Sequence, residues 1–196
     1  LVEASPKLRD IQAATLAGHQ ISWADTADAL PDQPLYLVAN EFFDALPIRQ
    51  FIRSGDGWRE RQIGVTDGTL SFGLGPVMPQ PALAQRLDDT AEGDLIEDCA
   101  QIAPIMHALS TRIGTHGGAA LIIDYGDWRS LGDTFQALHA HEKANPLTAP
   151  GTSDLTAHVD FEQLAAAAAP ALHTRVTPQG VFLERLGITQ RAQDLA

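Results

Sequence analysis

Residues 35–47 read LYLVANEFFDALP, an apolar run that stops abruptly in polar and aromatic side chains. The run predicts a buried strand that is followed directly by Asn40, Glu41, Phe42, Phe43 and Asp44. In an open α/β sheet, ligands bind just beyond the carboxyl ends of the strands. Aromatic rings can form the walls of a pocket, and carboxylates can hold a cationic group. The alternatives are that Phe42 and Phe43 are core residues and that Asp44 is a cap or turn acid. The stretch therefore predicts both an α/β sheet and the position of its binding site.

A second stretch repeats this arrangement. Residues Ala119–Ile123 form an unbroken apolar run, which is typical of a strand in the buried middle of a sheet. It ends in Asp124 and Tyr125, so another carboxylate and another ring follow a strand end. Tyr125 either lies over a ligand or is a core tyrosine whose hydroxyl is satisfied.

The chain opens with a third strand end. Leu1–Ala4 predicts a short strand, and Ser5-Pro6 predicts the start of a helix that ends at Gly18. An acid such as Glu3 at this place in a nucleotide-binding fold typically accepts hydrogen bonds from ribose hydroxyls. The alternative is a surface carboxylate near a helix start.

Between these strands the pattern changes to that of an antiparallel β-meander. Its three expected strands are separated by Gly-rich hairpin signals, and a Gly/Pro-rich linker follows over residues 73–81. The expected meander strands are Ile48–Arg53, Trp58–Val65 and Thr69–Phe72. Elsewhere we expect a strong helix over Glu97–Ile113, helices over Asp160–Ala169, Gln179–Leu186 and Thr189–Leu195, and strands over Ile21–Trp23 and His173–Thr177.

This order of elements predicts an α/β fold, a doubly wound Rossmann-like sheet with an inserted antiparallel β-meander. We expect the α/β domain to comprise residues 1–47 and 97–196. The meander is expected over residues 48–81, and a linker over residues 82–96. The first residues already resemble a strand end, which predicts that the sequence begins partway into a domain.

Composition excludes several classes of function. The 196 residues are 44% hydrophobic, as in a globular protein. The net charge is −12 and the sequence contains no basic cluster, which argues against nucleic acid as the main partner. The single cysteine permits no disulfide within the chain, which suits a reducing compartment. No run of about 18 apolar residues is present, so no membrane span is expected.

A long polar loop, Thr148–Asp160, contains a candidate base or substrate contact, His158. The alternative for His158 is a surface histidine that water satisfies. A zinc site is not expected, because His139 and His141 lack a third clustered ligand. A phosphate-binding loop and a hydrolase nucleophile elbow are also not found.

Four motifs resemble one known family. In chain order they are LVEASPKLRDIQ, NEFFDALP, GGAALIIDYGD and APGTSDLTAHVDF, and together they cover essentially the whole chain. They resemble the MidA family of S-adenosylmethionine-dependent methyltransferases, whose mitochondrial members are arginine methyltransferases in complex I assembly. The resemblance implies a class I methyltransferase fold and S-adenosyl-L-methionine as the cofactor. It also implies a glycine-rich cofactor loop upstream of the first strand, which this sequence lacks.

The resemblance implies roles for the strand-end residues. Glu3 would bind the cofactor ribose, with Asn40 beside the cofactor. From the chemistry of the side chains, our own hypothesis is that Glu41 holds and aims a substrate guanidinium with Asp44 supporting it, and that His158 accepts a proton or contacts the peptide. The remaining rim residues, Phe42, Phe43, Asp124 and Tyr125, would shape the substrate slot.

The expected function is therefore methylation of an arginine in a respiratory complex I subunit. Two alternatives stay open: a non-catalytic assembly or docking module that keeps the fold, and a methyltransferase for a small molecule. The expected location is the cytoplasm for a bacterial protein or the mitochondrial matrix for a eukaryotic one.

Overall fold

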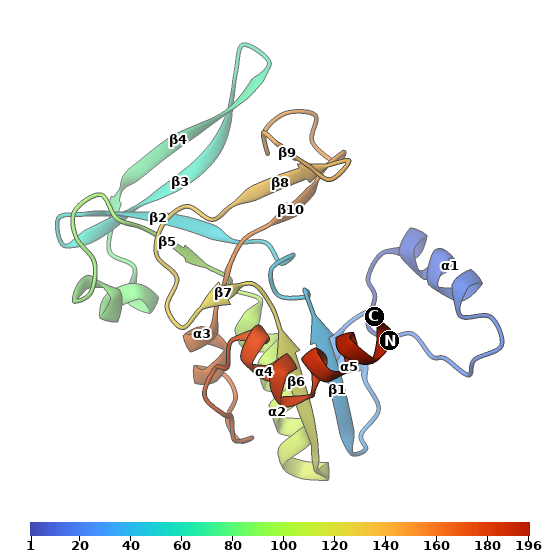
Figure 1. Cartoon of the computed structure of the whole chain (residues 1–196). Helices are drawn as coiled ribbons and strands as arrows, with labels where there is room; N and C mark the ends of the chain where they lie inside the picture. Colours follow the sequence, from blue (N-terminus) through green and yellow to red (C-terminus); the bar gives the residue numbers. More distant parts are fainter.

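The structure is a computed structural model that describes all residues, 1–196. It combines helices with four small sheets, so the chain is of the α/β class, as predicted (Figure 1). The helices are α1 (Pro6–Thr15), α2 (Ile102–His116), α3 (Phe161–Ala166), α4 (Gln179–Arg185) and α5 (Ile188–Leu195), with short 3-10 helices η1 (Ala27–Ala29) and η2 (Pro81–Leu87). The strands are β1 (Leu35–Asn40), β2 (Arg49–Ser54), β3 (Gly57–Thr66), β4 (Thr69–Met78), β5 (Leu95–Asp98), β6 (Gly118–Ile123), β7 (Gly126–Asp127), β8 (Gln136–His139), β9 (Glu142–Ala144), β10 (Asp154–Thr156) and β11 (Val159–Asp160).

The two strands that the sequence singled out pair with each other. β1 and β6 run parallel, in a register that joins Leu35 to Gly118 and Asn40 to Ile123. Gly118 is required here, because a Cβ atom at this position would lie 1.9 Å from the carbonyl oxygen of Leu35. The pairing places the two carboxyl ends, and the polar residues that follow them, side by side.

β1 alternates between half-buried and exposed residues, so the prediction of a buried strand is wrong for one of its faces. The prediction that β6 is buried is wrong for most of its length. Its first four residues are exposed and only Ile122 and Ile123 are half-buried. The reason is that β6 pairs with β1 alone, so its other edge has no neighbouring strand.

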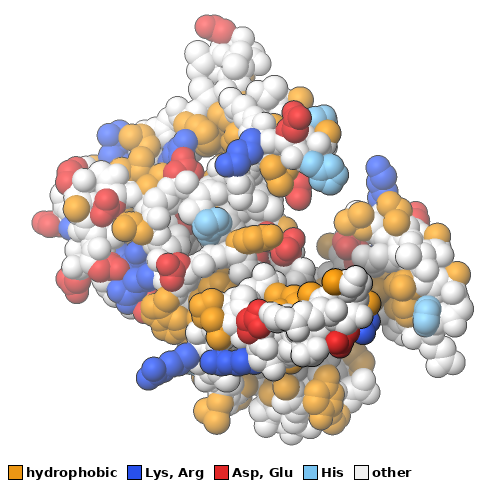
Figure 2. All heavy atoms as spheres, viewed as in Figure 1, with side chains coloured by type: hydrophobic (Ala, Val, Ile, Leu, Met, Phe, Trp, Pro, Cys, Tyr) orange, Lys and Arg blue, Asp and Glu red, His pale blue; other side chains and the backbone are white.

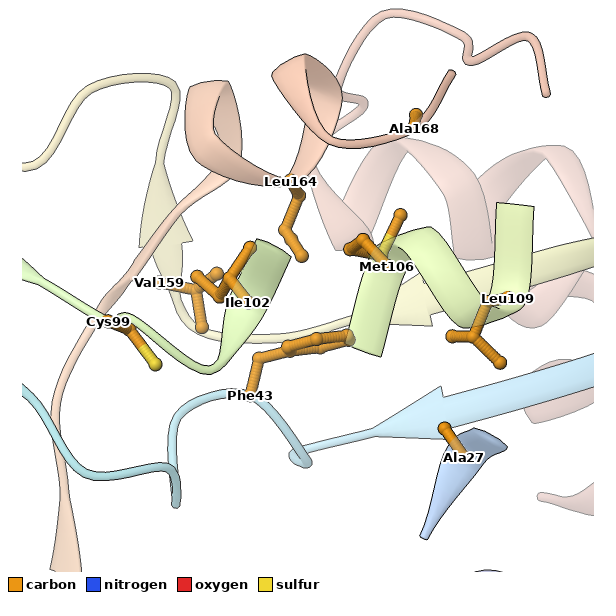
Figure 3. Close-up of a cluster of buried hydrophobic side chains, with 9 residues drawn as sticks. All are labelled: Ala27, Phe43, Cys99, Ile102, Met106, Leu109, Val159, Leu164 and Ala168. Carbon is orange, nitrogen blue, oxygen red and sulfur yellow. The ribbon is translucent and has the colours of Figure 1, made fainter. Parts of the chain in front are cut away.

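The main core lies between the β1–β6 pair, α2 and α3. Figure 3 shows Met106 of α2 between Phe43 and Leu164 of α3, with Leu109 farther along the helix. The core also contains Ala27, Cys99, Ile102, Val159 and Ala168. Asp160 caps α3 by accepting a hydrogen bond from the Gln163 backbone at 3.1 Å, which confirms the predicted helix start. The loop after β1 is therefore anchored in the core through Phe43.

The meander forms a second sheet in the order β4-β3-β2-β5. Its β3–β4 connection is the two-residue turn Asp67-Gly68, and both residues have positive φ, as a type I′ turn requires. A separate small core joins Phe51, Trp58 and Ile96 of this sheet to Leu83 of η2. In Figure 1 the β3–β4 hairpin extends away from the rest of the molecule.

Two predictions for this region are wrong. Residues Gly73–Met78 belong to β4, because they pair with β3 around a β-bulge between Arg59 and Arg61. Pro76 is tolerated there because β4 is an edge strand. The predicted helix start at Glu97 is also wrong, since Leu95–Asp98 pairs with β2 as the fourth strand and α2 begins at Ile102.

The N-terminal residues form a small lobe that carries α1. The Ser5 side chain accepts from the backbone nitrogen of Leu8 at 3.4 Å and Pro6 lies in the first turn, as predicted. The two predicted short strands are reduced to one parallel bridge between Val2 and Ala24. In Figure 1 α1 lies to the right of the β1–β6 pair and apart from it.

The C-terminal part departs from prediction at three places. The predicted polar loop Thr148–Asp160 contains β10 and β11, and α3 ends at Ala166 instead of Ala169. Residues His173–Thr177 form no strand, and instead line a cavity beside the unpaired edge of β6. Helices α4 and α5 lie within a residue or two of their predicted positions. None of the helices has the length and apolar character needed to cross a lipid bilayer.

Candidate functional site

The loop after β1 is held by Asp124, the residue that follows β6. Oδ2 of Asp124 accepts hydrogen bonds from the backbone nitrogens of Phe42 at 3.2 Å, Phe43 at 2.9 Å and Asp44 at 3.4 Å. Its Oδ1 accepts from the Tyr125 nitrogen at 3.0 Å. The Asp124 carboxylate thus fixes the course of the chain on which Glu41 and Asp44 stand. Glu41 itself has a left-handed backbone, with φ of 49°, and is exposed.

The segment that carries His158 is held by hydrogen bonds from three successive backbone nitrogens, two of which donate to the loops after β1 and β6. The Ala157 nitrogen donates to the carbonyl of Asp44 at 3.0 Å, and the Val159 nitrogen donates to the carbonyl of Tyr125 at 2.8 Å. Between them, the His158 nitrogen donates to Oγ1 of Thr134 at 2.8 Å. The exposed His158 side chain therefore lies on a well-fixed backbone beside Asp44 and Tyr125.

A glycine makes this attachment possible. β7 and β11 pair in parallel, with Gly126 opposite Val159. A Cβ atom at residue 126 would lie 2.0 Å from the carbonyl oxygen of Val159, so no other residue allows this approach. The Asp124-Tyr125-Gly126 sequence thus positions two loops at once.

Burial and like charge dominate the electrostatics of the site. Burial, with Asp124 and Glu41 nearby, raises the pKa of Asp44 to about 6. Burial also raises the pKa of Asp124. The hydrogen bonds that it accepts from four backbone N–H groups lower this pKa in part. No salt bridge of the structure includes Glu41, Asp44 or Asp124. The site is therefore acidic, and no cationic side chain of the protein forms a salt bridge with these three acids.

The predicted aromatic residues differ in their surroundings. Phe43 is a core residue, while Phe42 is half-buried and meets its ring edge-to-face at a centroid distance of 5.0 Å. Tyr125 is 60% exposed, so its ring is free to contact a bound molecule. Phe43 lies beneath the loop, and Phe42 and Tyr125 lie nearer its surface.

Two cavities adjoin these loops. The larger, of about 610 Å³, is an apolar hollow between α2, β6, α3 and residues 171–182, and Asp124 lies on its wall. The smaller, of about 10 Å³, lies between Phe43 and His158 and is about the size of one water molecule. Glu3, Asn40 and Glu41 line neither of them.

Glu3 stands apart, in the N-terminal lobe. Its Oε1 accepts from the Ser5 nitrogen at 2.8 Å and its Oε2 from Nε2 of Gln12 at 3.1 Å. Each carboxylate oxygen keeps a second lone pair, so the oriented group can still accept from ribose hydroxyls. The acceptor oxygens of Glu3 therefore fit the predicted contact with the cofactor ribose. Figure 2 shows a hollow between this lobe, on the right, and the body of the molecule.

Three residues of the site were not predicted from the sequence. Thr134 and Glu97 hold the His158 backbone, since Glu97 accepts from both the backbone nitrogen (3.0 Å) and the hydroxyl of Thr134. Asp154 adds negative charge near Asp44. Asp154 lies inside the fourth motif and could have been found there, but no local signal connects Thr134 to a residue 24 positions away.

The sequence matches a family model over residues 1–178, and that family is described as "Putative S-adenosyl-L-methionine-dependent methyltransferase". This chain belongs to that family. Among curated relatives, it is 37% identical over 223 aligned positions to the mitochondrial protein arginine methyltransferase NDUFAF7 of Xenopus laevis. It is 35% identical to the human protein of the same name. The alignments cover all of this chain and 50% of each relative, so the chain spans about half the length of those proteins.

A solved structure extends the comparison to the fold. A COG1565 superfamily member from Burkholderia thailandensis, crystallised with S-adenosyl-homocysteine, matches 85% of this chain with a TM-score of 0.69 and 28% identity. The alignment covers 46% of that protein. The predictions of a class I methyltransferase fold and of S-adenosyl-L-methionine as the family's cofactor are thus confirmed.

Proposed function

We propose that this chain is part of a protein arginine N-methyltransferase that uses S-adenosyl-L-methionine. The observation that carries the proposal is the uncompensated acidic site after β1 and β6, where Asp44 is buried and Glu41 is exposed on a fixed loop. The naming of the curated relatives as arginine methyltransferases supports the same activity.

An arginine side chain matches this charge pattern. Its guanidinium is protonated at any physiological pH and presents several N–H donors in a planar fork. Carboxylates hold such a group by charge-assisted hydrogen bonds, localise its charge and direct one nitrogen. Glu41 is our candidate for that role, with Asp44 supporting it and His158 as a proton acceptor or peptide contact. Phe42 and Tyr125 would border the slot above Phe43.

The cofactor, when bound, supplies a methyl group on a sulfonium centre. Methyl transfer is an in-line displacement, so the protein contributes chiefly by holding the nucleophile about 3 Å from the methyl carbon. Glu3 would orient the cofactor through its ribose, and Asn40 would lie where the cofactor meets the substrate slot. Asp124 would contribute by fixing the loop rather than by touching the substrate.

The MidA resemblance and the names of the relatives lead us to a subunit of respiratory complex I as the substrate. They also favour the mitochondrial matrix if the source is eukaryotic, and the cytoplasm if it is bacterial. The predictions of no nucleic-acid partner and of no resident metal remain part of this proposal.

The test is methyl transfer by the full-length protein. It would be incubated with S-adenosyl-L-methionine carrying a labelled methyl group and with a complex I preparation, and the products would be hydrolysed to amino acids. Labelled methylarginine supports the proposal. Label in small molecules alone would indicate a small-molecule methyltransferase, and no transfer at all would indicate a docking module.

A further inference from the structure

The β3–β4 hairpin presents one apolar face to solvent. Ile63 pairs with Phe72 in the middle of the hairpin, and residues two positions along each strand lie on the same face, because side chains alternate between the two faces. Ile63 is 54% exposed and Val65 is 70% exposed. The opposite face carries only glutamine, glycine, serine and threonine. The apolar hairpin face consists of Ile63, Val65, Leu70, Phe72 and Leu74.

This part of the hairpin has no third strand to support it. β2 pairs with β3 only as far as Arg61, so residues 62–73 form a ribbon of two strands. A ribbon of two strands is marginally stable in water unless its apolar face packs against something. Between Arg61 and Arg86 the only charged residue is Asp67, at the turn. An uncharged, exposed apolar surface of this kind marks an interaction site.

Arg61 connects the apolar hairpin face to the body of the molecule. Its guanidinium lies 3.7 Å from the centroid of the Phe72 ring. The same guanidinium forms a salt bridge with Asp133 and donates to Oε1 of Gln50 at 3.2 Å. Gln50 pairs with Arg61 across β2 and β3, so its side chain lies on the same side of the sheet. The hairpin face is therefore held in a fixed position relative to the buried Gln50.

Hydrogen bonds continue from Gln50 to the candidate site. Nε2 of Gln50 donates to Oε1 of the buried Glu97 at 2.8 Å. Glu97 accepts from the backbone nitrogen of Thr134 at 3.0 Å and from its hydroxyl. The Thr134 hydroxyl in turn accepts from the His158 nitrogen at 2.8 Å. The apolar hairpin face thus lies on the side of the sheet on which the His158 backbone is held, and it is continuous with the candidate site.

We propose that the apolar hairpin face is the docking surface for the protein that carries the target arginine, and that it binds an apolar segment of that protein near the arginine. The inference rests on the proposed function for the identity of the partner. It concerns a surface that takes no part in methyl transfer itself.

Charge favours a substrate over a second copy of this chain as the occupant. A second copy would bring another net charge of −12 against the first, and like charges of that size repel. A partner with an apolar segment beside a cationic side chain matches a neutral surface beside an acidic site. The acidic site alone attracts any cation, so the hairpin face would provide the selectivity among arginines.

The first test is photo-crosslinking in the full-length protein, which needs no turnover. p-Benzoylphenylalanine is placed at residue 65, on the apolar hairpin face, or at residue 66, on the opposite face, and both positions are exposed. Each protein is irradiated with the complex I preparation. We expect residue 65 to crosslink to an apolar segment near an arginine of one subunit, and residue 66 to give no such product. Crosslinks to a second copy, equal products from both positions or no product would overturn the proposal.

The second test is kinetic and uses the crosslinked subunit as substrate. Ile63→Thr/Val65→Thr keeps two β-branched residues but removes apolar surface, and Gln62→Thr/Ser71→Thr changes the opposite face as the control. We expect the first variant to raise KM for the subunit about tenfold, with unchanged kcat and unchanged affinity for S-adenosyl-L-methionine. The control should match the wild type.

A wild-type KM in Ile63→Thr/Val65→Thr would overturn the docking role while leaving the proposed function intact. Conversely, crosslinks from residue 65 without any methyl transfer by the wild type would contradict the proposed function and leave the docking surface supported. The two failures are therefore distinguishable.

Discussion

Oδ2 of Asp124 lies 2.9 Å from the backbone nitrogen of Phe43, and the same oxygen accepts from the residues on either side of Phe43. This carboxylate joins the end of β6 to the loop after β1. The acidic site therefore depends on a residue that was predicted to touch substrate and whose contacts in the structure are to the chain itself.

Replacing Asp124 with alanine should loosen the loop after β1. Hydrogen bonds to a charged group contribute about 1.5–3 kcal/mol, so we expect a loss of about 2–4 kcal/mol in the free energy of unfolding by urea. Amide exchange at Phe42 and Phe43 should accelerate. Asp127→Ala is the matched control, because that exposed acid accepts only from its neighbour Trp128, at 2.6 Å. Equal effects of the two variants would show that Asp124 does not hold the loop.

Asp44 should make the free energy of unfolding depend on pH. Its pKa is about 6 in the folded chain against about 4 when unfolded, so the folded state binds the proton more tightly. Stability from this group is present below pH 4 and is lost as the pH rises through 6. Relative to the wild type, Asp44→Asn should thus gain up to about 3 kcal/mol between pH 4 and pH 7.5. Unfolding curves for both proteins that change in parallel with pH would contradict the assignment.

Thr134 should position His158 through its hydroxyl. Thr134→Val removes both the acceptor for the His158 nitrogen and the donor to the buried Glu97, whereas Thr134→Ser keeps them. We expect the valine variant to show changed His158 ring chemical shifts in NMR and faster exchange of its amide, and the serine variant to resemble the wild type. If serine and valine give the same spectra, the hydroxyl has no positioning role.

Arg112 should stabilise the approach to β1. From α2 its guanidinium donates to backbone carbonyls before that strand, including Pro31 at 3.0 Å and Leu30 at 2.7 Å. Arg112→Met would leave several carbonyls, among them the buried one of Ala27, without this donor, at a cost of about 3 kcal/mol in thermal or urea unfolding. Arg185→Met, at an exposed position at the end of α4, should cost little. A small effect at Arg112 would mean that water replaces its bonds.

The sequence was most informative where local chemistry decides the structure. Apolar runs that stop in polar residues marked β1 and the end of β6, Ser5-Pro6 and Asp160 marked helix starts, and Asp67-Gly68 marked a hairpin. The prediction failed where pairing with a strand distant in the sequence decides the local structure. Leu95–Asp98 became a strand because β2 offered an edge, whereas His173–Thr177 forms no strand although it lies beside the unpaired edge of β6.

The same distinction holds for the site. Motif position alone predicted that the residues after β1, the residues after β6 and His158 belong together, and hydrogen bonds join their segments. Motifs could not show that Asp124 binds backbone, that Phe43 is core, or that Thr134 lies under His158, because these are contacts between distant residues. The roles proposed for the individual side chains remain predictions.

The most direct test of the account compares the full-length protein with its Glu41→Gln variant, using Glu142→Gln of β9 as an exposed control. Calorimetry would give the affinity for S-adenosyl-L-methionine, and mass spectrometry would count methylated arginines in the substrate. We predict unchanged cofactor affinity in all three proteins and loss of arginine methylation in Glu41→Gln alone. Wild-type methylation by Glu41→Gln would contradict the claim that acids at this strand end hold the arginine.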